Sequence, residues 1–187
     1  MLEAILSVQP KTGSGGGKSR DEVITDIANF VESKTPPVFP IHEISKKYPT
    51  SYEESMNTVL VQEVIRYNRL LAVMKENLIN VKKALKGLIV MSEELELIAN
   101  SLFDNQVPKL WDEKGFLSMK PLASWTEDLN AGIEFLQKWI DNGTPQCFWI
   151  SGFFFPQAFL TGTLQNYARK HIIAIDKLSF EFKYLDL

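Results

Sequence analysis

The segment Thr12–Ser19 is the first candidate for chemistry, because it ends in the Gly-Lys-Ser of a phosphate-binding loop. Such a loop requires a glycine five residues before Gly17, and Thr12 occupies that position. It also needs a preceding strand and a helix that starts at the lysine, so that amides and the helix dipole meet the phosphate. Only a short apolar stretch, expected to form a helix over residues 2–8, precedes it before Pro10. We therefore interpret residues 12–18 as a flexible connection.

The other reactive side chains lack the partners that catalysis or metal binding requires. His42 and His171 are far apart and follow no metal-ligand spacing. Ser151-Gly152 is not a nucleophile turn, because the residue two before Ser151 is Trp149 instead of glycine. The glutamates cluster where helices are expected to start, where they favour the helix dipole. We expect no catalytic, cofactor-binding or metal-ligating residue in this chain.

Composition places the 187 residues in one globular domain. The chain is 45% hydrophobic and 23% charged, with a net charge of -3, so a packed core is expected. There is no basic stripe for a nucleic-acid backbone, no apolar run long enough to span a membrane and no secretion-signal pattern. The single cysteine, Cys147, excludes an internal disulfide and is predicted to be a buried thiol in a reducing cytosol.

The next helical signal after the connection at residues 12–18 is Ser19, which forms a capping box with Glu22 and starts a helix that extends to about Lys34. The three prolines of Thr35–Pro40 predict an extended connection, and Ile41–Tyr48 allows one or two helical turns. A stiff segment is therefore expected to connect the first of these helices to the longest element.

The longest element is a helix predicted over Ser55–Lys86, about 46 Å long. Apolar residues recur from Leu60 to Leu85 in alternating steps of four and three, as in a coiled-coil heptad. Additional apolar residues such as Val59, Val61 and Leu70 widen the face beyond a narrow seam. A buried central helix is favoured, and an adaptor that binds a partner helix through the Leu60–Leu85 face is the alternative.

Shorter elements follow after Gly87, which ends the long helix. We expect a helix of about 12 residues from Ser92, a single turn within Val107–Gly115 and an extended segment over Phe116–Pro121. Further signals predict a helix capped by Ser124 and closed at Asn142-Gly143, a helix from Pro156 to about Lys170, and a strand over Leu178–Tyr184. No other clean strand signal is present, so the fold class is mainly α.

The aromatic stretch Phe148–Phe155 is predicted to be a buried strand or loop, because six of its eight residues are Phe, Trp or Ile. The middle of the long helix offers an apolar band for it at Tyr67, Leu71 and Met74. We expect Trp149 or Phe153 to pack on that helix.

Several long strings resemble the C-terminal region of dynein heavy chains, especially the axonemal ones. They include SMNTVLVQEVIRYNRL at Ser55–Leu70 and FWISGFFFPQAFLTG at Phe148–Gly162. The same pattern continues in Leu85–Ser92, Val107–Trp111 and Gln165–Lys170. The resemblance covers almost the entire sequence.

This resemblance implies a position after the sixth AAA+ module of a motor that hydrolyses ATP with magnesium and pulls on microtubules. It implies one helical domain over residues 1–187, built as a bundle around one long central helix and lying across the ring, with the β-rich subdomain that follows in the family absent. The expected function is non-catalytic bracing of the AAA+ ring. The implied partners are the rest of the heavy chain and, through it, other dynein subunits and the microtubule. The implied location is the cytoplasm and cytoskeleton, in the axoneme of a cilium or flagellum.

Overall fold

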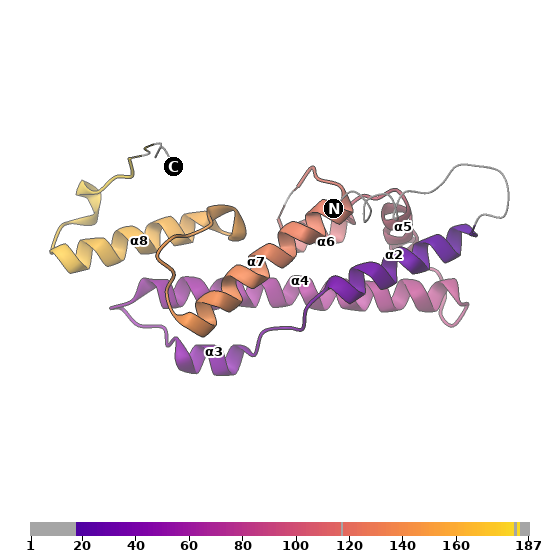
Figure 1. Ribbon diagram of the computed structural model, residues 1–187, viewed down its shortest axis with the longest axis horizontal. Coiled ribbons are helices and arrows are strands. Elements are labelled where there is room, and N and C mark those ends of the chain that lie inside the picture. The colour runs from indigo at the N-terminus through magenta and orange to yellow at the C-terminus, as the bar shows by residue number, and fades with distance from the viewer. Residues whose placement is uncertain (1–17, 117, 182, 184–187) are drawn as a thin grey trace.

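The computed structural model describes residues 18–116, 118–181 and 183, and these contain seven α-helices and no strand (Figure 1). The predicted helix at residues 2–8 and the glycine-rich segment up to Gly17 lie outside the described residues. The elements are α2 (Arg20–Lys34), α3 (Ile41–Lys47), α4 (Ser55–Leu85), α5 (Glu93–Phe103), α6 (Lys109–Lys114), α7 (Leu122–Asn142), the 3-10 turn η1 (Ile150–Gly152), α8 (Pro156–His171) and the 3-10 turn η2 (Ile175–Lys177).

Helix α4 is the axis of the bundle. Its 31 residues correspond to about 46 Å, and the helices α2, α3, α5, α6, α7 and α8 all contact it (Figure 1). Buried positions recur along its whole length, from Met56 to Ala84, while its middle exposes the mostly polar stripe Arg69, Ala72, Lys75 and Glu76. The prediction of a mainly helical bundle around one buried central helix is confirmed.

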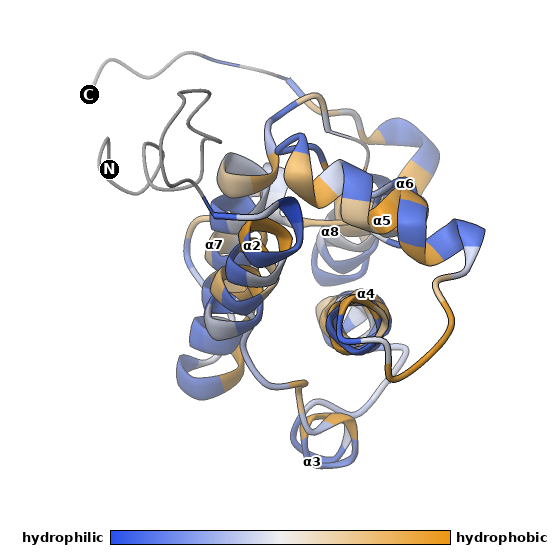
Figure 2. Cartoon of the chain, turned by 90° about the vertical axis from the view of Figure 1, so that its right-hand side faces the viewer, coloured by the Kyte–Doolittle hydropathy of each residue, from blue (hydrophilic) through white to orange (hydrophobic). Residues whose placement is uncertain are grey.

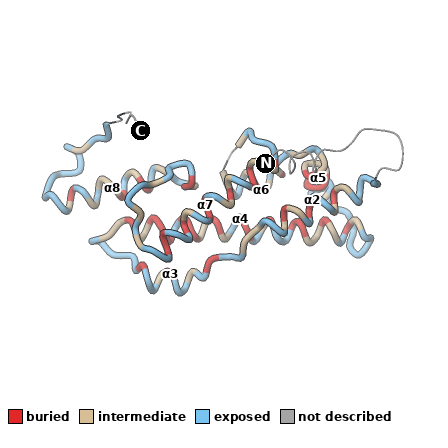
Figure 3. Tube along the Cα trace, in the orientation of Figure 1, coloured by how far each residue is buried: buried red, intermediate tan, exposed pale blue. Residues whose placement is uncertain are grey.

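The core lies between α4 and the helices α2 and α7, as the buried segments of Figure 3 show. Trp111, Trp125 and Trp139 are at most 1% exposed, and the indole nitrogen of Trp111 donates a hydrogen bond to Asn77 of α4 at 2.9 Å. Helices α4 and α7 meet closely at Gly132, where a Cβ would lie 2.0 Å from the hydroxyl of Tyr67. A glycine is therefore required at this position within a helix.

Most predicted boundaries are confirmed. Ser19 and Glu22 form the capping box of α2, Gly143 ends α7 with φ 89°, and Pro156 is the first residue of α8. Ser124, however, is not the N-cap of α7. The helix starts two residues earlier at Leu122, because Pro121 already has a preset φ of -58° and its carbonyl accepts a hydrogen bond from Trp125 N at 2.9 Å.

Two further predictions differ from the structure. Residues 178–181 and 183 form no strand, since no other described segment is extended beside them to pair with; residues 182 and 184 lie outside the described residues. Cys147 is exposed instead of buried, because it lies in the loop between α7 and η1, and such loops run over the surface.

Candidate functional site

Lys18 and Ser19, the last residues of the phosphate-loop-like segment, are engaged at the start of α2. Lys18 forms an ion pair with Asp26, and the hydrogen bond between them raises the pKa of Lys18. The Ser19 hydroxyl accepts a hydrogen bond from the backbone N–H of Glu22 at 3.3 Å. The Ser19 contact caps α2, and the ion pair joins Lys18 to Asp26 within that helix.

The remaining candidates for chemistry are separated. His42 is exposed on α3, and the ring of His171 lies against Tyr167 with centroids 4.2 Å apart. Ser151 is exposed within η1. Within residues 18–116, 118–181 and 183, no three metal-ligating side chains come together and no helix is long and apolar enough to cross a membrane. Two surfaces of the described part are the remaining candidates for function.

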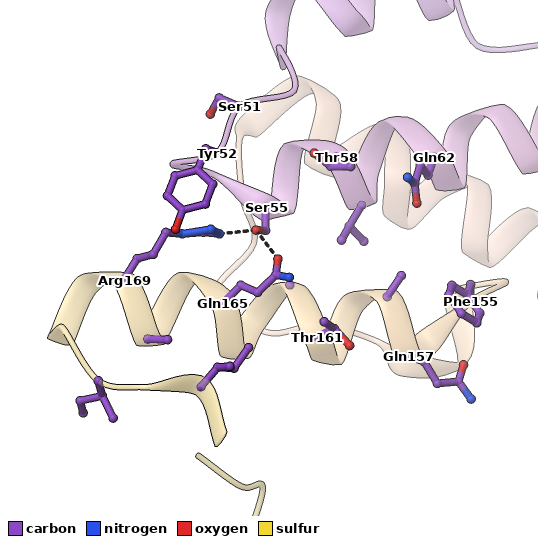
Figure 4. A pocket seen from close by; sticks show the side chains of 16 residues that line it. Ser51, Tyr52, Ser55, Thr58, Gln62, Phe155, Gln157, Thr161, Gln165 and Arg169 are labelled. Carbon is purple, nitrogen blue, oxygen red and sulfur yellow. Dashed lines mark hydrogen bonds between the residues drawn. The ribbon is translucent and has the colours of Figure 1, made fainter. Parts of the chain in front are cut away.

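One such surface is a groove of about 800 Å³ between the first half of α4 and helix α8 (Figure 4). Much of its lining is apolar, including Val59, Ala158 and Ile173. Its uncharged hydrogen-bonding side chains are Ser55, Thr58 and Gln62 on α4, and Gln157, Thr161 and Gln165 on α8. Their spacings of three to four residues place each set on one helical face. Ser55 donates to Gln165 across the groove at 2.8 Å, so the groups that stay open to an occupant are mainly those farther along both helices.

Arg169 closes one end of this groove. One of its terminal nitrogens donates to Ser55 Oγ and to Asn166 Oδ1, and the guanidinium lies 4.7 Å from the centre of the Tyr52 ring. Its Nε is buried and has no hydrogen-bond partner, and no described carboxylate lies within 4.0 Å of it. The site thus carries a positive charge that lacks an ion-pair partner among the described residues.

The opposite end of α4 carries a second surface, the aliphatic loop Leu88–Met91. Figure 2 shows this loop in orange between the near end of α4 and α5. The four residues are 69%, 38%, 87% and 37% exposed, and Leu97 of α5 is also exposed. Four successive exposed apolar residues mark a contact surface in a folded protein. From the sequence, Gly87 was predicted only as the end of the long helix, although the run of four aliphatic residues after it was a usable signal for a surface.

The heptad face that defined the alternative adaptor function is not a free surface. Leu60, Val64, Leu71 and Leu78 are at most 2% exposed and belong to the core. A partner helix therefore cannot reach this face while the domain is folded.

The aromatic loop Phe148–Phe155 is anchored to α4 by polar groups. Glu63, whose side chain is 0% exposed, accepts hydrogen bonds from the backbone N–H of Phe154 at 2.6 Å and of Phe155 at 3.2 Å, and pairs with Arg66 at 2.7 Å. Burial raises the pKa of Glu63, while these donors oppose the rise. Tyr67 donates to the Gly152 carbonyl at 2.7 Å, and burial raises the pKa of this phenol as well.

The rings of the aromatic loop contact three helices, α4, α7 and α8. Trp149 or Phe153 was predicted to pack on α4, but the ring that meets Tyr67 of this helix is that of Phe154. The two rings lie edge-on with their centroids 4.4 Å apart. Phe153 is 5% exposed, and its ring contacts those of Phe135 on α7 and Phe159 on α8. The loop therefore fastens α8 to both α4 and α7.

The family defined by the C-terminal domain of dynein heavy chains matches residues 1–187, which is the whole sequence. The protein belongs to this family. It is 58% identical over 185 residues to dynein axonemal heavy chain 1 of Rattus norvegicus and 49% identical over 183 residues to dynein axonemal heavy chain 3 of Homo sapiens. It is also 45% identical over 188 residues to dynein axonemal heavy chain 12 of Mus musculus.

These alignments cover 98 to 99% of this dynein C-terminal domain but only 4 to 6% of each relative. The resemblance drawn from the strings at Ser55–Leu70 and Phe148–Gly162 is thereby confirmed. The groove and the aliphatic loop therefore belong to a domain that corresponds to a small part of these far longer relatives.

Proposed function

We propose that this protein is a non-catalytic structural segment of an axonemal dynein heavy chain, a microtubule-based ATP-driven motor, and that it braces the AAA+ ring. Its direct partner is the rest of the same heavy chain. Other dynein subunits and the microtubule are reached through that chain, which also holds ATP and magnesium outside this segment. The proposed location is the axoneme of a cilium or flagellum. The family membership and the names of the relatives support this assignment.

The observation that carries the bracing role is the distribution of exposed surface along α4. The middle of the helix is packed on several sides, while the aliphatic loop Leu88–Met91 and the groove lie at its two ends. A stiff helix of about 46 Å with contact surfaces at both ends can hold two neighbouring parts of a large protein at a fixed distance. A catalytic domain would instead gather its titratable groups in one pocket.

The bracing role is tested in the full-length heavy chain by changing Leu88 and Val90 to serine together. Loss of the apolar contact should lower the thermal stability of the ring and slow microtubule gliding, while the isolated 187-residue protein melts as before. The matched control changes the exposed Lys75 and Glu76 to serine. A ring whose stability and motility do not respond would contradict the bracing role.

The absence of catalysis is tested on the isolated 187-residue protein, which should show no measurable ATP hydrolysis. Turnover that disappears in Lys18→Ala would instead establish a nucleotide-binding enzyme. The adaptor alternative predicts a stable dimer in sedimentation that dissociates when Leu71 and Leu78 become polar. The core role of these residues predicts a monomer that fails to fold with the same changes, because buried polar groups without partners cost several kcal/mol in total.

A further inference from the structure

We propose that the groove between α4 and α8 binds a short, extended acidic segment of the same heavy chain, whose carboxylate pairs with Arg169. The inference rests on the proposed function, because it requires this domain to be part of a longer motor. It specifies the chemical group that binds at one contact, which the bracing role does not specify.

The walls of the groove fit a peptide backbone. The hydroxyl and amide groups of Ser55, Thr58, Gln62, Gln157, Thr161 and Gln165 include both donors and acceptors. From Gln157 to Arg169, α8 rises roughly 18 Å at 1.5 Å per residue. An extended segment of about five or six residues covers this length. Its N–H and C=O groups would find partners in the exposed Gln62, Gln157 and Thr161, whereas Ser55 and Gln165 already bond to each other.

Arg169 selects the charge of the occupant, because it is the only charged residue among those described as lining the groove. The nearest acid along the sequence from Ser55, Glu54, accepts hydrogen bonds from Asn166 and from the backbone N–H of Met56, and forms no ion pair with Arg169. Stacking on Tyr52 fixes the plane of the guanidinium. One terminal nitrogen already donates to Ser55 and Asn166 and Nε is buried, so the other terminal nitrogen is the donor left for a carboxylate. A carboxylate bound there would offset a charge that has no ion-pair partner among the described residues.

An apolar residue is expected at the other end of the bound segment. Phe155 lines the groove at the end away from Arg169 and is 46% exposed (Figure 4). The ring of Phe155 is also approached by Arg66, whose guanidinium lies 5.2 Å from its centre, so the ring is held in position. The recognised pattern is therefore a carboxylate followed or preceded, about four or five residues away, by an apolar side chain.

A segment of the same heavy chain is favoured over a separate protein because the groove is open and its contacts are few. Such a site binds a free peptide weakly, whereas a tethered segment is present at an effective concentration in the millimolar range. The relatives are far longer than this domain, which spans 4% of their length, so in the full-length heavy chain many acidic segments are tethered to it.

The test places the photo-crosslinker p-benzoylphenylalanine at Thr161 in the full-length heavy chain and maps the products by mass spectrometry. We expect a crosslink within the same polypeptide to one segment that contains Asp or Glu. Arg169→Gln should lower its yield roughly tenfold or more, and Arg169→Lys should lower it less, because lysine keeps the charge but loses the contacts to Ser55 and Asn166 that position it. The crosslinker at the exposed Lys75 is the control for nonspecific capture.

A second variant separates loss of binding from loss of folding, since Arg169 also holds Ser55. Gln62→Trp fills the groove away from Arg169 and should abolish the crosslink while the helical content of the protein is unchanged. Products that join another polypeptide, products that both variants leave unaffected, or no product at all would each overturn the proposal. Failure here leaves the bracing role intact if the Leu88 and Val90 serine variant still weakens the ring.

Discussion

Two apolar loops of this domain differ in how they pack against the rest of the protein. The aromatic loop Phe148–Phe155 follows α7, and the aliphatic loop Leu88–Met91 follows α4; both consist almost entirely of large apolar residues. In the first, Phe153 is 5% exposed and lies in the core, although Trp149, Ile150 and Phe155 of the same loop are 39%, 44% and 46% exposed. In the second, exposure reaches 87% at Val90. Hydrophobicity alone therefore does not determine which loop is buried.

The difference lies in the partners that α4 provides for the backbone. Beneath the aromatic loop, Glu63 accepts two backbone N–H groups and Tyr67 donates to a carbonyl. In the aliphatic loop, Leu88 N bonds the carbonyl of Lys83 at 2.9 Å, and no acceptor among the described residues serves the N–H groups of residues 89–91. Because buried backbone groups must be paired, the first loop can pack against α4, whereas the second is exposed to solvent.

The largest effect on stability is expected when one ring of the packed loop is removed. Phe153→Ala should lower the free energy of unfolding by about 3 to 5 kcal/mol, because it empties a site enclosed by aromatic rings. Chemical denaturation of the 187-residue protein measures this loss. The matched control is Phe155→Ala, whose ring is 46% exposed and should cost clearly less. A loss below about 1 kcal/mol at Phe153 would remove the contrast between the two loops.

The next largest effect on stability is expected when Glu63, the polar anchor of this loop, is removed. Glu63→Ala should cost about 2 to 4 kcal/mol, since it leaves the N–H groups of Phe154 and Phe155 without an acceptor. Glu76→Ala, at an exposed position of the same helix, should change stability by less than about 0.5 kcal/mol. Urea denaturation compares the two variants. Equal losses would show that the anchor does not hold the loop.

The anchor also predicts a dependence on pH. Burial raises the pKa of Glu63 above 4.5, so the folded protein holds this proton more tightly than the unfolded one. This contribution to stability is present below about pH 4.5 and is lost as the pH rises through the raised pKa. The loss is at most about 1.4 kcal/mol for each pH unit.

Because Glu63→Gln cannot titrate, its stability subtracted from that of the unmodified protein should give a difference that falls as the pH rises above about 4.5. Denaturation midpoints at successive pH values provide the measurement. A difference that grows with pH would mean that Arg66 and the two N–H donors outweigh burial.

The sequence predicted the helices well where local signals and burial agreed. The capping box at Ser19, the apolar period from Leu60 to Leu85 and the glycine at position 143 each have a local physical meaning that the fold retains. Ser124 was misleading because Pro121 provided a competing start for the helix. The strand predicted at Leu178–Tyr184 had a clear alternating pattern, but alternation cannot supply a neighbouring strand.

The candidate site was less predictable than the fold. Whether Cys147 is buried, or whether the two loops pack, depends on contacts between residues far apart in sequence. Glu63 resembles any other charge on a helix, and nothing local indicated that it accepts hydrogen bonds from residues about 90 positions later. The groove has the same origin, since its two sets of polar side chains come from α4 and α8 and become a site only when the aromatic loop brings these helices together.

The smallest effect on stability is expected in the exposed loop, and it is the most informative for function. Val90→Ser should change the free energy of unfolding of the 187-residue protein by less than about 0.5 kcal/mol, because the side chain is already 87% exposed. Val64→Ser, at a buried position of α4, should cost at least about 1.5 kcal/mol and serves as the control. Denaturant titrations of both variants decide the comparison. A large loss at Val90 would show that the loop already packs within this domain, and the contact surface assigned to the end of α4 would then have to be sought elsewhere.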